Sequence, residues 1–215
     1  MTSLGDAFHS APLDETLRAA IEADGLRIDR VGDDDRAASD RWTDAVARGF
    51  LDGERNDLQR GEAFARSRYR RKIGVYDPAA VQPDEPVTTF ASWIAELTLP
   101  GGAAIPMCAI SAVTVAPTHR RRRLLSRVMA GELRTAVAQG APIAGLTVSE
   151  SGIYGRFGFA PAAAATSWEI RTRRAGWIGP VAPGRLDYVT REQARDAAAA
   201  LHERTSVLLH EIDEA

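Results

Sequence analysis

Four consecutive arginines occupy positions 120–123, between a predicted strand and a predicted helix. The surrounding segment, residues 112–125, reads AVTVAPTHRRRRLL. A strand that leads directly into a helix presents the free backbone N–H groups and the positive dipole end of that helix, and this arrangement suits a pyrophosphate. The arginine side chains would add charge-assisted hydrogen bonds to the same anion. A solvated basic run at a turn is the alternative interpretation.

A tyrosine between two glycines is the second group that could do chemistry. Residues 148–161 read VSESGIYGRFGFAP, so Tyr154 lies between Gly152 and Gly155, after a predicted strand end. Glycine lets the backbone approach a ligand closely and turn tightly. Tyr154 is therefore a candidate catalytic residue. A tyrosine that only packs against the sheet is the alternative, because aromatic residues are more often core than catalytic.

The single cysteine and the four histidines do not form a metal-binding pattern. Cys108 lies in an apolar run, where we expect a buried, unreactive thiol. The histidines are scattered, and the closest pair, His202 and His210, has no third ligand type at a suitable spacing. We therefore expect no metal site.

Hydrophobic periodicity places these groups in a series of strands and helices. We expect strands at residues 26–31, 72–76, 87–99, 105–115, 143–148 and 163–171. Helices are expected from about residue 36 to 51 and at 58–71, 123–138 and 151–157. We interpret the arginines at positions 60, 66, 68, 70 and 71 as a solvated helix face rather than a basic patch. The order of elements predicts an α/β fold with two antiparallel central strands.

The character of the chain changes after about residue 175. Glycines and prolines between 176 and 184 indicate a linker, followed by a strand candidate at 186–189 and a helix at about 190–209. We therefore expect one domain over residues 1–175, and a linker with the start of a second unit over residues 176–215.

Length and composition indicate one main, soluble domain. The chain has 215 residues, 45% of them hydrophobic, and a net charge of −2, which gives no overall bias toward polyanions. The first twenty residues carry no apolar signal segment, and no stretch approaches the roughly 20 apolar residues of a membrane span. We expect a cytoplasmic protein with neither a nucleic-acid partner nor a membrane span.

Together the two groups resemble the GNAT superfamily of acetyl-CoA dependent N-acetyltransferases. The phrases ISAVTVAPTHRRRRLL and SESGIYGRFGFAP are similar to the enhanced intracellular survival (Eis) proteins within that superfamily. The resemblance covers about residues 26–171. It implies the GNAT fold, α/β (α+β) with a mixed central sheet and helices on both faces. It also implies acetyl transfer from acetyl-CoA, by direct attack, to a primary amine of an aminoglycoside, a polyamine or a lysine-like substrate.

The resemblance assigns roles to individual positions. Tyr154 matches the tyrosine that protonates the departing coenzyme A thiolate, a reasonable role for a positioned phenol. The strand backbone is expected to pair with the pantetheine arm, the turn and helix start to hold the pyrophosphate, and the next strand end to border the arm. The residues so assigned to the cofactor are Val113, Thr114, Val115, Arg120, Arg121, Arg122, Arg123, Leu124, Leu125, Ser126, Ser149 and Glu150.

Two departures from the family pattern bear on activity. Arg123 occupies a position where the superfamily's pyrophosphate loop has glycine, and we expect this arginine to keep a negative φ. Eis-like proteins are also longer, with further domains, hexamer formation and a chain-terminal carboxylate as the general base. The second part of this chain is then expected to be a truncated GNAT-like domain. A homo-oligomer is a further expectation, and a catalytically weak coenzyme A binding module is the alternative function.

Overall fold

The computed structural model describes residues 3–99, 101–148, 151–163, 166–176, 178–180 and 183–211. The chain divides into two compact units. One contains Met1–Leu97 and Ala104–Phe159, and the other contains Thr98–Ala103 and Ala160–Ala215. The first unit holds the elements that carry the candidate site. The predicted boundary near residue 175 stays a prediction.

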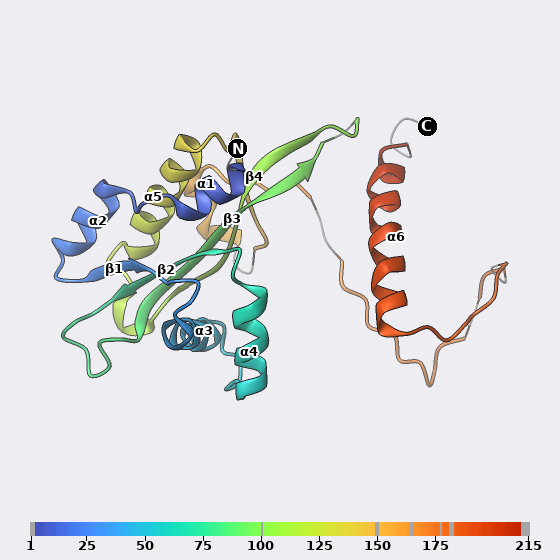
Figure 1. The fold of residues 1–215 in the computed structure, drawn as a ribbon, viewed down its shortest axis with the longest axis horizontal. Coiled ribbons are helices and arrows are strands. Elements are labelled where there is room, and N and C mark those ends of the chain that lie inside the picture. The colour runs from blue at the N-terminus through green and yellow to red at the C-terminus, as the bar shows by residue number, and fades with distance from the viewer. Residues whose placement is uncertain are drawn as a thin grey trace. The chain divides into compact units, whose positions relative to one another are not determined.

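A mixed sheet forms the centre of the first unit (Figure 1). Within the described residues it has the order β1-β2-β3-β4-β5, which is also the chain order. The β1/β2 and β2/β3 pairs are antiparallel, whereas β4 and β5 are parallel. The strands are β1 Arg27–Arg30, β2 Arg71–Tyr76, β3 Pro86–Thr98, β4 Ala104–Val115 and β5 Ile143–Leu146.

Helices cover both faces of this sheet (Figure 1). The face shared by α1, α2 and α5 lies opposite the face that carries α3 and α4. The predicted α/β class, with a mixed sheet and helices on both faces, is thereby confirmed. The helices are α1 Leu4–Ser10, α2 Glu15–Glu22, α3 Arg36–Phe50, α4 Asp57–Arg66 and α5 Leu124–Ala138.

The two N-terminal helices were not expected from the sequence. Each begins at a side-chain cap: Ser3 Oγ accepts a hydrogen bond from Asp6 N at 3.1 Å, and Asp14 Oδ1 accepts one from Leu17 N at 2.7 Å. Their buried side chains, Phe8 in α1 and Leu17 in α2, belong to the main core. Tertiary packing rather than length stabilises these short helices.

The main core lies between the sheet and the helices α1, α2 and α5. Its fully buried members include Phe8, Ile28, Phe90, Cys108 and Met129. The expected burial of the Cys108 thiol is confirmed, and burial raises its pKa to about 12.

Arg71 corrects the expectation of a solvated arginine face. Helix α4 ends at Arg66, and Arg71 instead opens β2 with its side chain 0% exposed. Its guanidinium donates to Glu132 Oε2 at 3.0 Å and to the backbone oxygens of Ala11 and Pro12. A buried guanidinium needs such partners, and Glu132 supplies the opposite charge from α5.

The chain after β5 differs most from the sequence-based expectations. Residues 151–157 form two short 3₁₀ turns, η2 Ser151–Ile153 and η3 Gly155–Phe157, in place of one helix. Strands were also predicted at 163–171 and 186–189, but the described residues of these ranges form no strand. A segment becomes a strand only where its backbone hydrogen-bonds to a neighbouring strand. The predicted last helix is present as α6 Arg191–Glu211. No helix in the described parts of the chain is long and apolar enough to cross a membrane.

Candidate functional site

Strand β4 extends beyond its parallel partner. The β4/β5 register runs from Met107 opposite Ile143 to Ile110 opposite Leu146, where β5 ends. Strand β4 continues to Val115, so its edge from residue 111 to 115 lies past the paired region. The two strands therefore leave a gap in the sheet into which an extended ligand can add main-chain hydrogen bonds.

A strained backbone position marks the start of this gap. Ala112 has φ 52°, a left-handed conformation that is uncommon in a strand. Thr89 Oγ1, from β3, donates to Ala112 O at 2.8 Å and lies 2.7 Å from Thr114 Oγ1. Because the one hydroxyl hydrogen of Thr89 goes to the carbonyl, Thr114 donates in the second bond. These two hydrogen bonds hold β4 in its irregular backbone conformation at Ala112.

The predicted arginine segment forms a tight loop in front of α5. A 3₁₀ turn, η1 Pro117–His119, follows β4, and α5 begins at Leu124 with Arg123 as its N-cap. Arg121 and Arg123 have φ values of 65° and 58°. The expectation of a negative φ at Arg123 is therefore wrong. The left-handed backbone conformation, which glycine adopts freely, costs an L-residue such as arginine about 1–2 kcal/mol.

A cavity of about 790 Å³ joins the strand edge, the arginine loop and the tyrosine turn. It brings together most of the residues assigned from the sequence. Those lining it are Val113, Thr114, Val115, Arg120, Arg121, Arg123, Leu124, Leu125, Ser126 and Tyr154. The N-terminus of α5 opens into this cavity, so its backbone N–H groups and four arginines, Arg120, Arg121, Arg123 and Arg156, surround one space.

Of the remaining assigned residues, the structure places one, Arg122, away from the cavity. Arg122 does not line it, and its Nη2 donates to Asp24 O at 3.5 Å. Successive residues of a tight loop point to different sides, which separates Arg122 from Arg121 and Arg123. Ser149 and Glu150 lie outside the described residues.

Tyr154 is partly buried and lines the cavity between the two 3₁₀ turns. Its ring packs edge-on against Phe159, with centroids 6.0 Å apart, and both residues pack against the main core. A Cβ added at Gly152 or Gly155 would meet no atom within 4 Å, so the space beside the tyrosine is open. The Tyr154 side chain thus both packs against the core and is accessible to a ligand in the cavity.

Several lining residues were not anticipated from the sequence. Gly49 and Phe50, at the end of α3, line the cavity, as do Ile110, Ser111, Ala112, Leu146, Thr147, Ile153 and Arg156. A Cβ at Gly49 would lie 2.4 Å from Thr114 Cγ2, so glycine is required for this close approach of helix and strand. The sequence signal that could have indicated this contact is a glycine near the end of an amphipathic helix.

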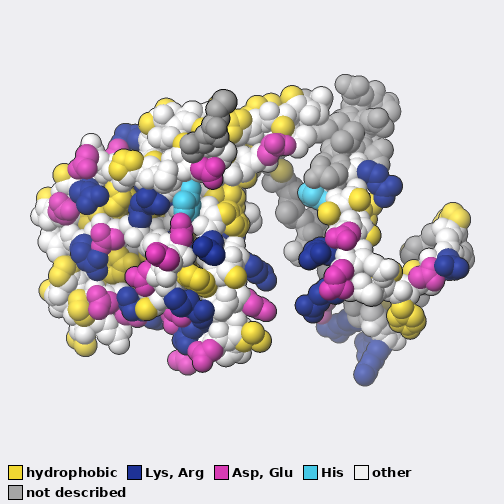
Figure 2. Space-filling model, in the orientation of Figure 1, with side chains coloured by type: hydrophobic (Ala, Val, Ile, Leu, Met, Phe, Trp, Pro, Cys, Tyr) yellow, Lys and Arg dark blue, Asp and Glu magenta, His cyan; other side chains and the backbone are white. Residues whose placement is uncertain are grey.

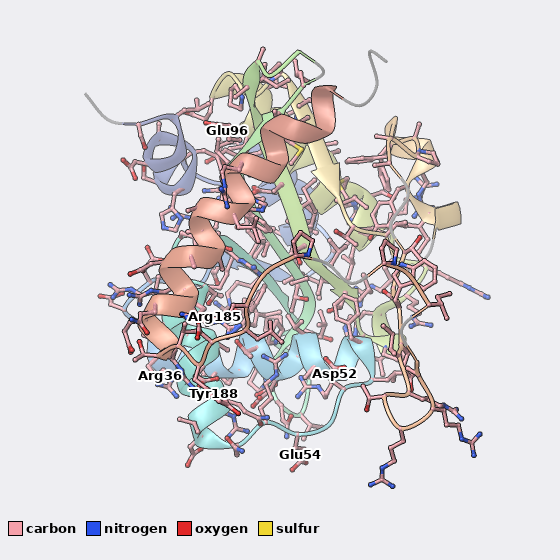
Figure 3. The ribbon with its side chains drawn as sticks, turned by 90° about the vertical axis from the view of Figure 1, so that its right-hand side faces the viewer. Arg36, Asp52, Glu54, Glu96, Arg185 and Tyr188 are labelled. Atoms are coloured by element: carbon pink, nitrogen blue, oxygen red, sulfur yellow. The ribbon has the colours of Figure 1, made fainter. Side chains whose placement is uncertain are left out.

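Charge beside the cavity is of mixed sign. Asp52 and Glu54, in the segment between α3 and α4, follow the lining residue Phe50 (Figure 3). They line a separate hollow of about 470 Å³ with Glu62 and the basic residues Arg55 and Arg66. On the face drawn in Figure 2, basic and acidic side chains of the first unit are interspersed.

Known proteins resemble this chain in sequence. A family model described as an acetyltransferase (GNAT) domain matches residues 33–162. An uncharacterized N-acetyltransferase of Streptomyces avermitilis is 42% identical over 170 residues, which cover 76% of this chain and 39% of that relative. The N-acetyltransferase Eis of Mycobacterium tuberculosis is 55% identical over 67 residues, covering 31% of this chain and 16% of Eis. The match with the Streptomyces relative thus spans about two fifths of that protein's length.

A solved structure shares the fold. AAC(6')-Iy, in complex with the bisubstrate analogue CoA-S-monomethyl-acetylneamine, has a TM-score of 0.52 to this chain. It covers 68% of this chain and 98% of its own, at 11% identity. This similarity concerns the fold alone.

Proposed function

We propose that this chain, which belongs to the GNAT acetyltransferase family, binds acetyl-CoA in the cavity beside β4 and transfers the acetyl group to a primary amine. One observation carries the proposal: the open edge of β4, the N-terminus of α5 and Tyr154 line the same cavity. Each supplies a different requirement of the reaction, namely a surface for an extended amide chain, an anion site and a proton donor.

The strand edge provides the site for the pantetheine arm. The arm contains amide groups in an extended chain, and the backbone at residues 113–115 can pair with them as a neighbouring strand would. The gap past the β4/β5 register leaves room for this pairing. The thioester is then held at the end of the cavity where Tyr154 lies.

The arginine loop provides the site for the pyrophosphate. Backbone N–H groups at the start of α5 have no intrahelical acceptor, and Arg123, the N-cap residue, makes no side-chain capping hydrogen bond to them. Arg120, Arg121 and Arg123 also line the cavity and can donate charge-assisted hydrogen bonds to phosphate oxygens. Helix dipole and guanidinium charge therefore favour the same anion.

Transfer proceeds by direct attack of the amine nitrogen on the thioester carbonyl. A C–N bond forms, the C–S bond breaks, and the thiolate leaves with the electron pair. The attacking nitrogen loses a proton to a carboxylate or a water chain as general base, and Tyr154 donates its phenolic proton to the departing thiolate as general acid. The chain supplies orientation by holding both reactants in one cavity, which lowers the entropic part of the barrier.

The acceptor we propose is a cationic small-molecule amine. Asp52 and Glu54 lie just beyond the end of α3, near the cavity wall formed by Gly49 and Phe50. Carboxylates at this position attract a polyamine or an aminoglycoside toward the cavity. A catalytically weak coenzyme A binding module is the second candidate, because Arg123 occupies the loop position where the resembled superfamily has glycine.

Thermal unfolding with and without acetyl-CoA tests the binding step. We expect acetyl-CoA to raise the melting temperature and Arg121→Ala to weaken binding about 10- to 100-fold, the value of a charge-assisted hydrogen bond of roughly 1.5–3 kcal/mol. Arg122→Ala is the matched control and should bind nearly as wild type, since Arg122 does not line the cavity. No thermal shift at millimolar acetyl-CoA would refute the proposal.

A thiol-release assay over a panel of amines separates the two candidate functions. An acetyltransferase releases coenzyme A in an amine-dependent manner, whereas a binding module shows the thermal shift without release. The assay also ranks polyamines against aminoglycosides as acceptors.

A further inference from the structure

The arginine loop, defined here as residues 120–123, has a backbone that needs external support. Arg121 and Arg123 both lie in the left-handed region, with φ values of 65° and 58°. Such residues persist only where the surrounding structure fixes them. No side chain caps the start of α5, and the contact of Arg122 with Asp24 O is long, at 3.5 Å. Leu124, buried in the main core, anchors the loop on its far side, and the residues just before the loop are the other source of support.

His119 is the last residue before the loop, and it is buried at 8% exposure. Its Nε2 lies 3.0 Å from Asp77 Oδ2, and its Nδ1 lies 2.8 Å from Thr118 Oγ1. Its backbone N donates to Ala116 O at 2.9 Å. Both ring nitrogens and the main chain of His119 are thus fixed immediately ahead of Arg120.

The carboxylate that holds His119 is itself anchored. Ala79 N donates to Asp77 Oδ1 at 2.9 Å, and this bond, followed by the bond from His119, lowers the pKa of Asp77. An ionised carboxylate can only accept, so His119 Nε2 carries the hydrogen of the bond to Asp77. Asp77 directly follows β2, so the turn after β2 reaches the segment that precedes the arginine loop and α5.

We propose that His119 is a positioning residue that, through Asp77, holds the arginine loop in the conformation that faces the cavity. It touches neither the cofactor nor the reacting atoms and acts through the backbone of residues 120–123. The benefit of this arrangement is preorganisation, since a loop already fixed loses less entropy when an anion binds. The functional half of this inference rests on the proposed acetyl-CoA site, whereas the structural half does not.

Limited trypsin digestion tests the structural half without any ligand. Trypsin cuts after arginine, so cleavage within residues 120–123, identified by mass spectrometry of the fragments, reports loop opening. We expect His119→Ala and Asp77→Ala to speed these cuts about tenfold, the effect of losing one hydrogen bond to a charged group. His119→Gln, which keeps a side-chain N–H donor, should restore much of the protection.

His9→Ala is the matched control. His9 Nε2 lies 2.6 Å from Asp33 Oδ2, so this variant also removes a histidine–aspartate pair, but His9 lines a different hollow, together with Arg68 and Trp93. Cleavage in the arginine loop should be unchanged in His9→Ala. Equal acceleration in His9→Ala and His119→Ala would show a general loss of stability and overturn the proposal, as would unchanged cleavage in His119→Ala.

Titration with coenzyme A tests the functional half. We expect the dissociation constant to rise about tenfold in His119→Ala and in Asp77→Ala, with no further rise in the double variant, because the two residues act as one unit. His9→Ala should bind as wild type. If wild type fails to bind coenzyme A while His119→Ala still exposes the loop, the proposed function fails and the positioning role stands. Wild-type affinity in His119→Ala would refute the functional role of His119.

Discussion

At the scale of single residues, Arg121 and Arg123 combine a glycine-like backbone with a charged side chain. The sequence-based expectation placed Arg123 at negative φ because that is where arginine normally lies. The structure shows the opposite, with φ values of 65° and 58° at these positions. The side chains remain able to face the cavity, so the chain accepts backbone strain where anion recognition requires it.

Arg123→Gly should therefore stabilise the fold. Relief of a left-handed cost of about 1–2 kcal/mol exceeds the chain-entropy cost of a glycine, roughly 0.5–1 kcal/mol. The free energy of unfolding, measured by denaturant titration without ligand, should rise by about 0.5–1 kcal/mol. Arg120→Gly is the control: Arg120 has φ −64°, so that change should bring only the entropic loss. Destabilisation of equal size in both variants would contradict the assignment of strain to Arg123.

Tyr154→Phe separates catalysis from packing at the second predicted group. The change removes only the hydroxyl, so the edge-on contact with Phe159 should survive. A general acid contributes roughly 10²- to 10⁴-fold, and kcat should fall by about that factor while the coenzyme A dissociation constant changes little. Steady-state thiol release with a reactive amine measures kcat. Wild-type turnover in Tyr154→Phe would leave Tyr154 a packing residue.

At the scale of elements, the hydrophobic pattern of the sequence predicted those strands and helices that are determined by their own residues. The strands β1 to β5 and the helices α3, α4 and α5 were all expected, with ends shifted by one or more residues. Helices α1 and α2 were missed because their stability comes from burying side chains such as Phe8 and Leu17 in a core formed by distant segments.

The same limit explains the misplaced Arg71. Its sequence neighbours are basic and polar, which favours a solvated interpretation. Its partner Glu132 lies 61 positions away on α5, and Ser92 Oγ on β3 donates to the same carboxylate at 3.0 Å. Contacts at that separation leave no periodic trace in the sequence. The candidate site was found more completely, because its loop and helix start are contiguous in the chain.

Gly49→Ala tests the approach of α3 to β4. The added Cβ would lie 2.4 Å from Thr114 Cγ2, so helix or strand must shift, at a typical overpacking cost of about 1–3 kcal/mol. Gly61→Ala, within α4, is the matched control, since its Cβ would meet nothing closer than 3.9 Å. That change should stabilise the protein by up to about 1 kcal/mol through helix propensity. Thermal unfolding of both variants gives the comparison, and a stable Gly49→Ala would show that the contact is loose.

At the scale of the whole molecule, a buried thiol and a buried phenol make the free energy of unfolding depend on pH in the alkaline range. Burial raises the pKa of Cys108 from 9.0 to about 12 and that of Tyr76 from 10.0 to about 12. Both groups are neutral when protonated, so the folded state retains their protons to higher pH than the unfolded state does. Each contribution is complete below the unfolded pKa and is lost as pH rises toward the folded pKa.

Lys72 acts in the opposite direction. Burial lowers its pKa below 10.5, although its ammonium donates to Ser39 Oγ at 3.0 Å. The folded state thus releases this proton more readily than the unfolded state, and the resulting cost is relieved as pH rises toward 10.5. The alkaline stability of the wild type is therefore a sum of terms with different signs, and a single substitution is needed to isolate one of them.

Cys108→Ala isolates the thiol. Between pH 9 and 11, the unfolded thiol ionises while the folded thiol stays protonated, which removes up to about 1.4 kcal/mol of stability per pH unit from the wild type. The variant lacks this loss, so its free energy of unfolding should fall less steeply over that range, whatever its value at pH 7. Denaturant titrations of both proteins at pH 7, 9, 10 and 11 give the two slopes. Parallel slopes would show that the thiol ionises in the folded state as readily as in the unfolded chain, and that the core around Cys108 opens to solvent before the molecule unfolds.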